Sequence, residues 1–121
     1  MKYEFKIVAF TEDPDFAISL ATECNKYGFL LSFIEKSEDI LNEINNETIL
    51  VSLIDLNDKN YDGMNLCKKI KKEYDFPVFG VLNMFDKKIQ DKAKKVGYDL
   101  IFTKKMLLKS IKEVVIHVSK E

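Results

Sequence analysis

The sequence contains no arginine and no tryptophan, and only two cysteines, two prolines and one histidine among 121 residues. Without arginine, bidentate recognition of phosphate or guanine is missing, which argues against a dedicated nucleic-acid-binding protein. Cys24 and Cys67 are too few for a disulfide framework, and they indicate reduced thiols in a cytoplasmic protein. No apolar run approaches the ~20 residues of a membrane span, and the N-terminal residues lack the layout of a signal peptide. We therefore expect no association with a membrane.

The chain has the size and composition of one globular domain. Domains commonly have about 100–150 residues, and 46% of this chain is apolar. The net charge is only −1, but residues 1–60 hold 5 lysines against 12 acids, whereas residues 61–121 hold 14 against 8. Lysines on the solvent-exposed faces of helices explain this asymmetry most simply; a docking surface for an acidic partner is the alternative.

Five short apolar runs alternate with stretches that have helical spacing. The runs are Tyr3–Phe10, Phe29–Glu35, Thr48–Asp55, Pro77–Asn83 and Asp99–Thr103. Among the helical stretches, the second begins at Ser37, a plausible N-cap, and the fourth ends before Gly97, a predicted C-cap. Strict alternation of strands and helices predicts one α/β domain over residues 1–121, with a parallel sheet covered by helices on both faces.

Acidic residues and a lysine follow three of these strands, and such residues meet at one edge of a parallel sheet. Glu12 and Asp13 follow the first strand, Asp55 ends the third, and Lys104 follows the fifth. An unpaired carboxylate behind an apolar strand is costly. Acidic neighbours would raise the pKa of Asp55 or require a cation, and oxygen ligands favour Mg²⁺. A carboxylate nucleophile, a metal and a lysine suit phosphoryl transfer. From position alone, a helix cap or a solvated loop residue is the alternative reading of Asp55.

The chain resembles the receiver domain of bacterial response regulators, which accept the phosphoryl group in two-component systems. The resemblance covers essentially the whole chain and is carried by segments in the same order at matching separations. These segments are Lys6–Asp15, Leu53–Asp55 followed by Asp62-Gly63-Met64, Pro77-Val78, and Gly97-Tyr98-Asp99 followed by Lys104. The resemblance implies a flavodoxin-like (βα)5 fold, with a parallel five-stranded sheet of order 2-1-3-4-5.

The resemblance also implies a role for four residues. Asp55 would accept a phosphoryl group from a histidine kinase or phosphotransfer protein, and Lys104 would contact the phosphoryl oxygens. Glu12, Asp55 and the backbone carbonyl of Asn57 would hold Mg²⁺. A domain of this kind is a signalling module and not an enzyme.

Other positions depart from the family pattern. Thr11 replaces the first of two adjacent acids, so we expect weaker binding of Mg²⁺. Leu82 stands where the family has a switch hydroxyl, and Ile101 stands where it has a switch aromatic residue. A leucine cannot hydrogen-bond a phosphoryl group, so we expect the usual relay to be missing; if the register shifts by one residue, Asn83 supplies a polar group instead.

Three functions compete on this basis. The first is an atypical receiver that is phosphorylated on Asp55. The second is a pseudo-receiver, a protein-interaction or dimerisation module that works without phosphorylation through the face formed by the fourth helix, fifth strand and fifth helix, within residues 84–115. The third, a flavodoxin-like cofactor binder, is disfavoured because the acidic loop Thr11–Asp15 would repel a phosphate.

Overall fold

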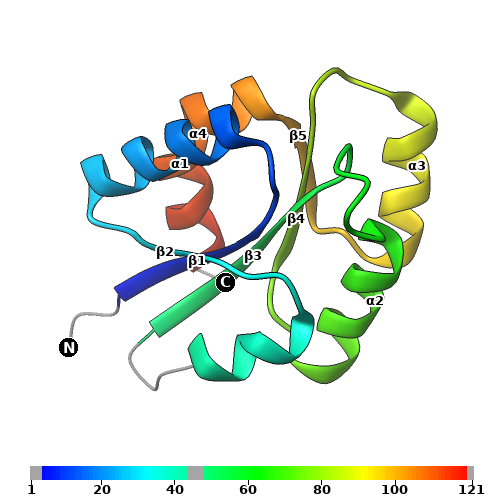
Figure 1. The fold of residues 1–121 in the computed structure, drawn as a ribbon, viewed down its shortest axis with the longest axis horizontal. Coiled ribbons are helices and arrows are strands. Elements are labelled where there is room, and N and C mark those ends of the chain that lie inside the picture. The colour runs from blue at the N-terminus through cyan, green and yellow to red at the C-terminus, as the bar shows by residue number, and fades with distance from the viewer. Residues whose placement is uncertain (1–3, 44–47, 120–121) are drawn as a thin grey trace.

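Five parallel strands form one sheet in the computed structural model of the protein, which describes residues 4–43 and 48–119 (Figure 1). The strands are β1 (Glu4–Phe10), β2 (Leu30–Phe33), β3 (Thr48–Asp55), β4 (Val78–Leu82) and β5 (Leu100–Thr103). The helical segments are α1 (Pro14–Tyr27), η1 (Ser37–Glu43), α2 (Gly63–Glu73), α3 (Lys87–Val96) and α4 (Lys104–Ser119). The strand order is β2-β1-β3-β4-β5, which confirms the predicted flavodoxin-like fold.

Strand β3 lies in the middle of the sheet and is buried on both faces from Leu50 to Asp55. Its side chains alternate between two cores, as the period of a strand requires. Leu53 packs with residues of α1 and α4, whereas Ile54 packs with residues of η1, α2 and α3. Figure 1 shows α1 and α4 on one face of the sheet and α2 and α3 on the other. The long apolar run of the sequence is therefore the central strand that its composition predicts.

Capping residues set the ends of two helices. Asp13 caps α1, and its side chain accepts hydrogen bonds from the backbone N–H groups of Asp15 and Phe16, while Pro14 occupies the first helical position. Pro14 fits there because its fixed φ suits a helix and no N–H is needed. Gly97 ends α3 with φ +112°, a left-handed conformation that favours glycine. The predicted C-cap is confirmed.

The second helical segment is a 3₁₀ helix and not a regular α-helix. Of its two apolar residues within the described range, Ile40 is fully buried, whereas Leu41 is 65% exposed. One buried anchor in seven residues gives little packing energy to support a longer helix, and most helical stability in proteins comes from such packing. Ile44, the next apolar residue of this stretch of the sequence, lies outside the described residues.

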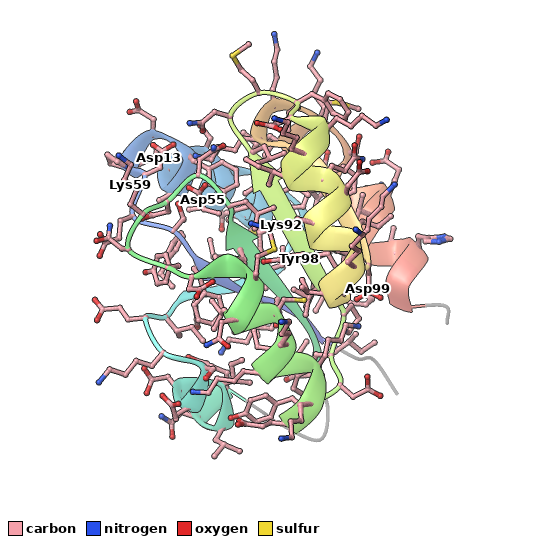
Figure 2. The ribbon with its side chains drawn as sticks, turned by 90° about the vertical axis from the view of Figure 1, so that its right-hand side faces the viewer. Asp13, Asp55, Lys59, Lys92, Tyr98 and Asp99 are labelled. Carbon is pink, nitrogen blue, oxygen red and sulfur yellow. The ribbon has the colours of Figure 1, made fainter. Side chains whose placement is uncertain are left out.

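Tyr98, a buried tyrosine between α3 and β5 (Figure 2), contacts the start of α2. The hydroxyl of Tyr98 donates a hydrogen bond to the carbonyl of Gly63 at 2.8 Å. Its ring lies against Gly80, where an added Cβ would come within 3.2 Å of the ring and 2.8 Å of Leu56 Cδ1. Gly80 therefore lets the tyrosine approach the sheet closely. Burial also raises the pKa of Tyr98 well above its usual range, so the hydroxyl keeps its proton.

Candidate functional site

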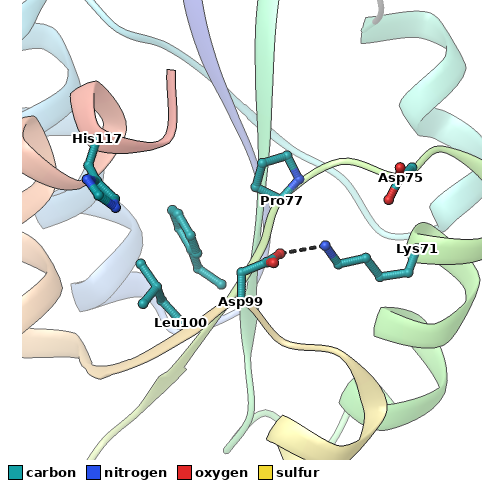
Figure 3. Close-up of a pocket in the computed structure, with 7 residues that line it drawn as sticks. Lys71, Asp75, Pro77, Asp99, Leu100 and His117 are labelled. Carbon is teal, nitrogen blue, oxygen red and sulfur yellow. Dashed lines mark ion pairs between the residues drawn. The ribbon is translucent and has the colours of Figure 1, made fainter. Parts of the chain in front are cut away.

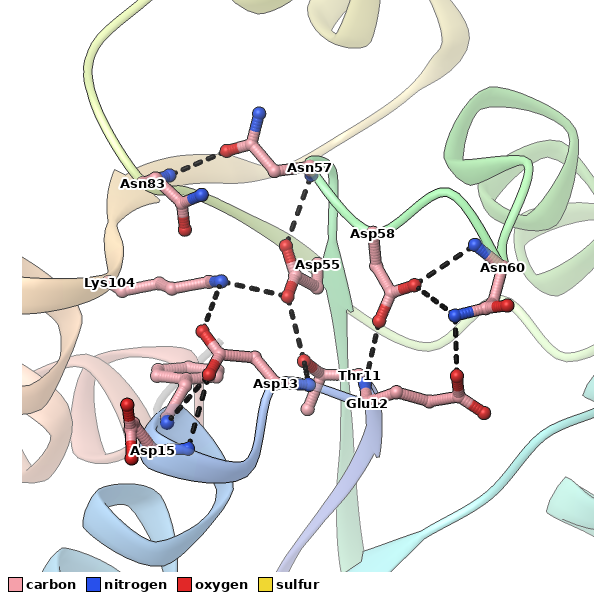
Figure 4. A network of polar contacts seen from close by, with 11 residues as sticks. Thr11, Glu12, Asp13, Asp15, Asp55, Asn57, Asp58, Asn60, Asn83 and Lys104 are labelled. Carbon is pink, nitrogen blue, oxygen red and sulfur yellow. Dashed lines mark hydrogen bonds and ion pairs between the residues drawn. The ribbon is translucent and has the colours of Figure 1, made fainter.

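Asp55 and Lys104 meet at the carboxyl edge of the sheet, where β3 ends and α4 begins (Figure 4). Asp55 is only 2% exposed. Its Oδ2 lies 2.9 Å from Nζ of Lys104, whose side chain is 13% exposed. A buried carboxylate is therefore paired with a largely buried cation, so neither charge is left uncompensated.

Two further donors complete the surroundings of the Asp55 carboxylate. The hydroxyl of Thr11, at the end of β1, donates to Oδ2 at 2.7 Å. The backbone N–H of Asn57 donates to Oδ1 at 3.1 Å. Thr11, which replaces an acid of the family pattern, thus adds a hydrogen-bond donor to Asp55 where a carboxylate would add repulsion.

Asp13 is the second carboxylate that contacts Lys104. Its Oδ2 lies 2.9 Å from Nζ of Lys104, whereas its other oxygen, Oδ1, accepts the hydrogen bonds that cap α1. The hydrogen bond from Lys104 is the largest cause that lowers the pKa of Asp13, and partial burial opposes it. For Lys104, partial burial lowers the pKa, but the hydrogen bonds and charges of Asp13 and Asp55 outweigh it, so the pKa is raised. The ammonium is consequently charged at neutral pH.

Glu12 does not join this cluster. Figure 4 shows its side chain turned away from Asp55 and towards Asn60, whose side-chain amide donates to the carboxylate of Glu12. Its backbone N–H donates to Oδ2 of Asp58 at 2.6 Å. Hydrogen bonds from the Asn60 backbone and side chain and from the Glu12 backbone outweigh the effect of burial and lower the pKa of Asp58. Glu12, Asp58 and Asn60 therefore form a separate polar cluster beside Asp55.

The oxygen atoms at this edge are chemically suited to Mg²⁺, which prefers carboxylate and carbonyl ligands. The predicted set consists of Glu12, Asp55 and the backbone carbonyl of Asn57. Among residues 4–43 and 48–119, no three acidic, histidine or cysteine side chains converge as they would around an ion. The Glu12 side chain would have to leave Asn60 to become a ligand, so the donor chemistry fits the metal while the side-chain arrangement is not assembled for it.

The side chain of Asn57 connects the loop after β3 to the loop after β4, a contact that the sequence analysis did not predict. Oδ1 of Asn57 accepts a hydrogen bond from the backbone N–H of Asn83 at 2.6 Å. The neighbouring Leu82 is 1% exposed and buried in the sheet, while Ile101 is partly buried and packs against the core on the α2–α3 face. Both positions are thus apolar packing residues, as their sequence predicts.

Sequence reasoning placed Asp13 at the same sheet edge as Lys104 but assigned it no ion pair, and it missed the hydroxyl contact of Thr11. A signal for the first was present, because an aspartate directly before a proline is typical of a helix N-cap, which fixes the carboxylate at the same sheet edge as Lys104. No local signal identifies the second, because the partner of Thr11 lies 44 residues away.

A separate hollow of about 280 Å³ lies at the opposite end of β4 and β5 (Figure 3). Its wall includes an ion pair of 2.6 Å between Lys71 and Asp99. Oδ2 of Asp99 also accepts a hydrogen bond from the backbone N–H of Val78 at 2.8 Å. These contacts hold the starts of two strands together, so they have a structural role away from the Asp55 cluster.

Comparison with solved structures identifies this fold as that of response regulator receiver domains. A two-component response regulator from Clostridium difficile is 18% identical, with a TM-score of 0.76, and the match covers 98% of this chain and 100% of that one. A response regulator from Thermotoga maritima is 17% identical with a TM-score of 0.73, over 93% and 98% of the two chains. A receiver domain protein from Methanospirillum hungatei JF-1 is 18% identical with a TM-score of 0.72, over 98% of each chain.

No protein-family model and no curated protein matches the sequence. The likeness therefore rests on the three-dimensional arrangement, and at these identities it establishes the fold. Within the part of the chain that the structure describes, no helix is long and apolar enough to cross a membrane.

Proposed function

We propose that the chain is an atypical receiver in a two-component phosphorelay, and that Asp55 accepts a phosphoryl group from a phosphohistidine of a histidine kinase or phosphotransfer protein. The observation that supports this most directly is the 2.9 Å contact between buried Asp55 and Lys104. A carboxylate with a fixed cation beside it is suited to attack a phosphorus atom, because the cation stabilises charge on the phosphoryl oxygens. The fold shared with response regulators adds support.

In the proposed reaction, an oxygen of the Asp55 carboxylate attacks phosphorus and forms an O–P bond while the N–P bond of the donor breaks. The electron pair of that bond stays on the imidazole nitrogen, which takes up a proton. Lys104 stays beside the phosphoryl oxygens and offsets their charge. Mg²⁺, when bound, supplies further positive charge there; Glu12, Asp55 and the carbonyl of Asn57 are its proposed ligands. Because the product stays on the protein, this function is signalling and not substrate turnover.

Labelling by a small phosphoryl donor tests the proposal. We expect acetyl phosphate with Mg²⁺ to add one phosphoryl group to the purified protein, measured by intact-protein mass spectrometry. Asp55→Asn should abolish labelling, because an amide is not a nucleophile of this kind. Asp91→Asn, at an exposed position of α3, is the matched control and should be labelled normally. Failure to label the wild-type protein, or labelling that persists in Asp55→Asn, contradicts the proposal.

A phosphorylation-independent pseudo-receiver is the second candidate, favoured by buried Leu82 in place of a switch hydroxyl and by the contact of Glu12 with Asn60. In this candidate, a partner or a second copy would dock on the α3–β5–α4 face, within residues 84–115. Titration with Mg²⁺ and beryllofluoride, followed by amide NMR, separates the two. Shifts around Asp55 support the receiver, and no response at saturation supports the pseudo-receiver.

A further inference from the structure

The carboxylate of Asp13 uses its two oxygens for different purposes. Oδ1 accepts hydrogen bonds from the backbone N–H groups of Asp15 at 3.1 Å and Phe16 at 3.3 Å. Oδ2 contacts Nζ of Lys104 at 2.9 Å. We infer that Asp13 is a positioning residue, which holds the Lys104 ammonium at the site whether or not Asp55 carries a charge.

The helix cap gives Asp13 the rigidity that this role requires. A carboxylate bound to two backbone N–H groups at the start of a helix cannot turn freely, so its second oxygen has a fixed direction. The centroid of the Phe16 ring, from the same helical turn, lies 5.4 Å from Nζ of Lys104. The start of α1 thus provides both a carboxylate and an aromatic face for the ammonium. Lys104 has two contacts that do not depend on Asp55.

The inference deepens the proposed function and rests on it for its biological purpose. Once a phosphoryl group is attached, Asp55 is an ester-like acyl phosphate and its own carboxylate charge is gone. A lysine held by Asp55 alone would have to exchange that carboxylate for the phosphoryl oxygens during the transfer. A lysine held also by Asp13 stays where the phosphoryl oxygens develop charge, so no rearrangement is needed during transfer.

Two aspartate-to-asparagine variants separate positioning from capping. Asp13→Asn keeps an oxygen that caps α1 but removes the negative charge beside Lys104. Asp86→Asn is the matched control, because Asp86 caps α3 through the N–H groups of Lys88 and Ile89 and forms no ion pair among the described residues. We expect both variants to keep their N-caps, since asparagine is as good an N-cap as aspartate. Asp13→Asn should lower the thermal unfolding midpoint more than Asp86→Asn, because it also removes the ion pair with Lys104.

The ¹⁵Nζ NMR signal of Lys104, assigned by its loss in Lys104→Met, shows directly whether the ammonium is held in place. This measurement needs no phosphorylation. We expect a signal protected from solvent exchange in the wild-type protein, in Asp86→Asn and in Asp55→Asn. In Asp13→Asn the contact from Asp55 remains, so the decisive comparison is between Asp55→Asn and the double variant Asp13→Asn with Asp55→Asn. In the double variant both carboxylates are gone, and the exchange should be faster than in Asp55→Asn by about 10-fold or more, as expected when a charged hydrogen bond is removed. Absence of the protected signal in wild type, its loss in Asp55→Asn, or its survival in the double variant would overturn the inference.

Labelling by acetyl phosphate supplies the functional readout. We expect the rate constant to fall about 10-fold in Asp13→Asn at saturating Mg²⁺ and to stay unchanged in Asp86→Asn. An unchanged rate in Asp13→Asn overturns the positioning role in transfer. If the wild-type protein is not labelled, the proposed function fails, while the ¹⁵Nζ measurement still decides whether Asp13 holds Lys104.

Discussion

Replacing Lys104 by methionine should destabilise the protein through Asp55. Methionine keeps the aliphatic length beside Phe16, but Asp55, which is 2% exposed, loses its cation. Breaking a buried ion pair costs about 3–5 kcal/mol. The bonds from Thr11 at 2.7 Å and Asn57 at 3.1 Å remain and favour the lower end of that range. We expect a loss of about 3 kcal/mol in the free energy of unfolding, and a melting temperature lower by roughly 10 °C.

Urea unfolding of three variants tests this reasoning. The neighbour Lys105 is exposed, so Lys105→Met should change the free energy of unfolding by less than about 0.5 kcal/mol. Asp55→Asn combined with Lys104→Met removes the unpaired charge and should recover about 2 kcal/mol of the loss. A cost below about 1 kcal/mol for Lys104→Met, or a double variant no more stable than Lys104→Met, would refute the claim that Asp55 depends on this cation.

Three further changes test other parts of the fold. The hydroxyl of Ser52 is buried and has no hydrogen-bond partner among the described residues, so Ser52→Ala should leave the free energy of unfolding unchanged or raise it, as measured in urea. Tyr98→Phe removes the buried hydrogen bond to the carbonyl of Gly63, which should cost about 0.5–1.5 kcal/mol in the same assay. Burial raises the pKa of Cys24 and of Cys67 to about 11, so both thiols stay protonated at pH 8. A disulfide reagent at that pH should therefore label them only after unfolding, and rapid labelling of the native protein would contradict their burial.

The strands were predictable because burial on both faces leaves a long apolar run, as in β3, and the order of acids and lysine along the chain placed Asp55 near Lys104. The orientation of the Glu12 side chain was not predictable, because it depends on Asn60, whose position is set by the irregular loop after β3 and not by the end of a strand. The 3₁₀ conformation of η1 was not predicted for a related reason. The spacing of apolar residues indicates a helix, but how many of them are buried depends on the neighbouring elements.

The three charged side chains of the site come from distant parts of the chain, and this has a consequence for folding. Asp13 and Lys104 are separated by 91 residues, so their contact closes most of the chain into one loop. Long loops are closed late, after local contacts have formed. We expect Lys104→Met to leave the folding rate nearly unchanged and to raise the unfolding rate by roughly 100-fold, as for a contact absent from the transition state. Stopped-flow kinetics would then show that the contacts of Lys104 form after the transition state of folding and are broken before the transition state of unfolding is reached.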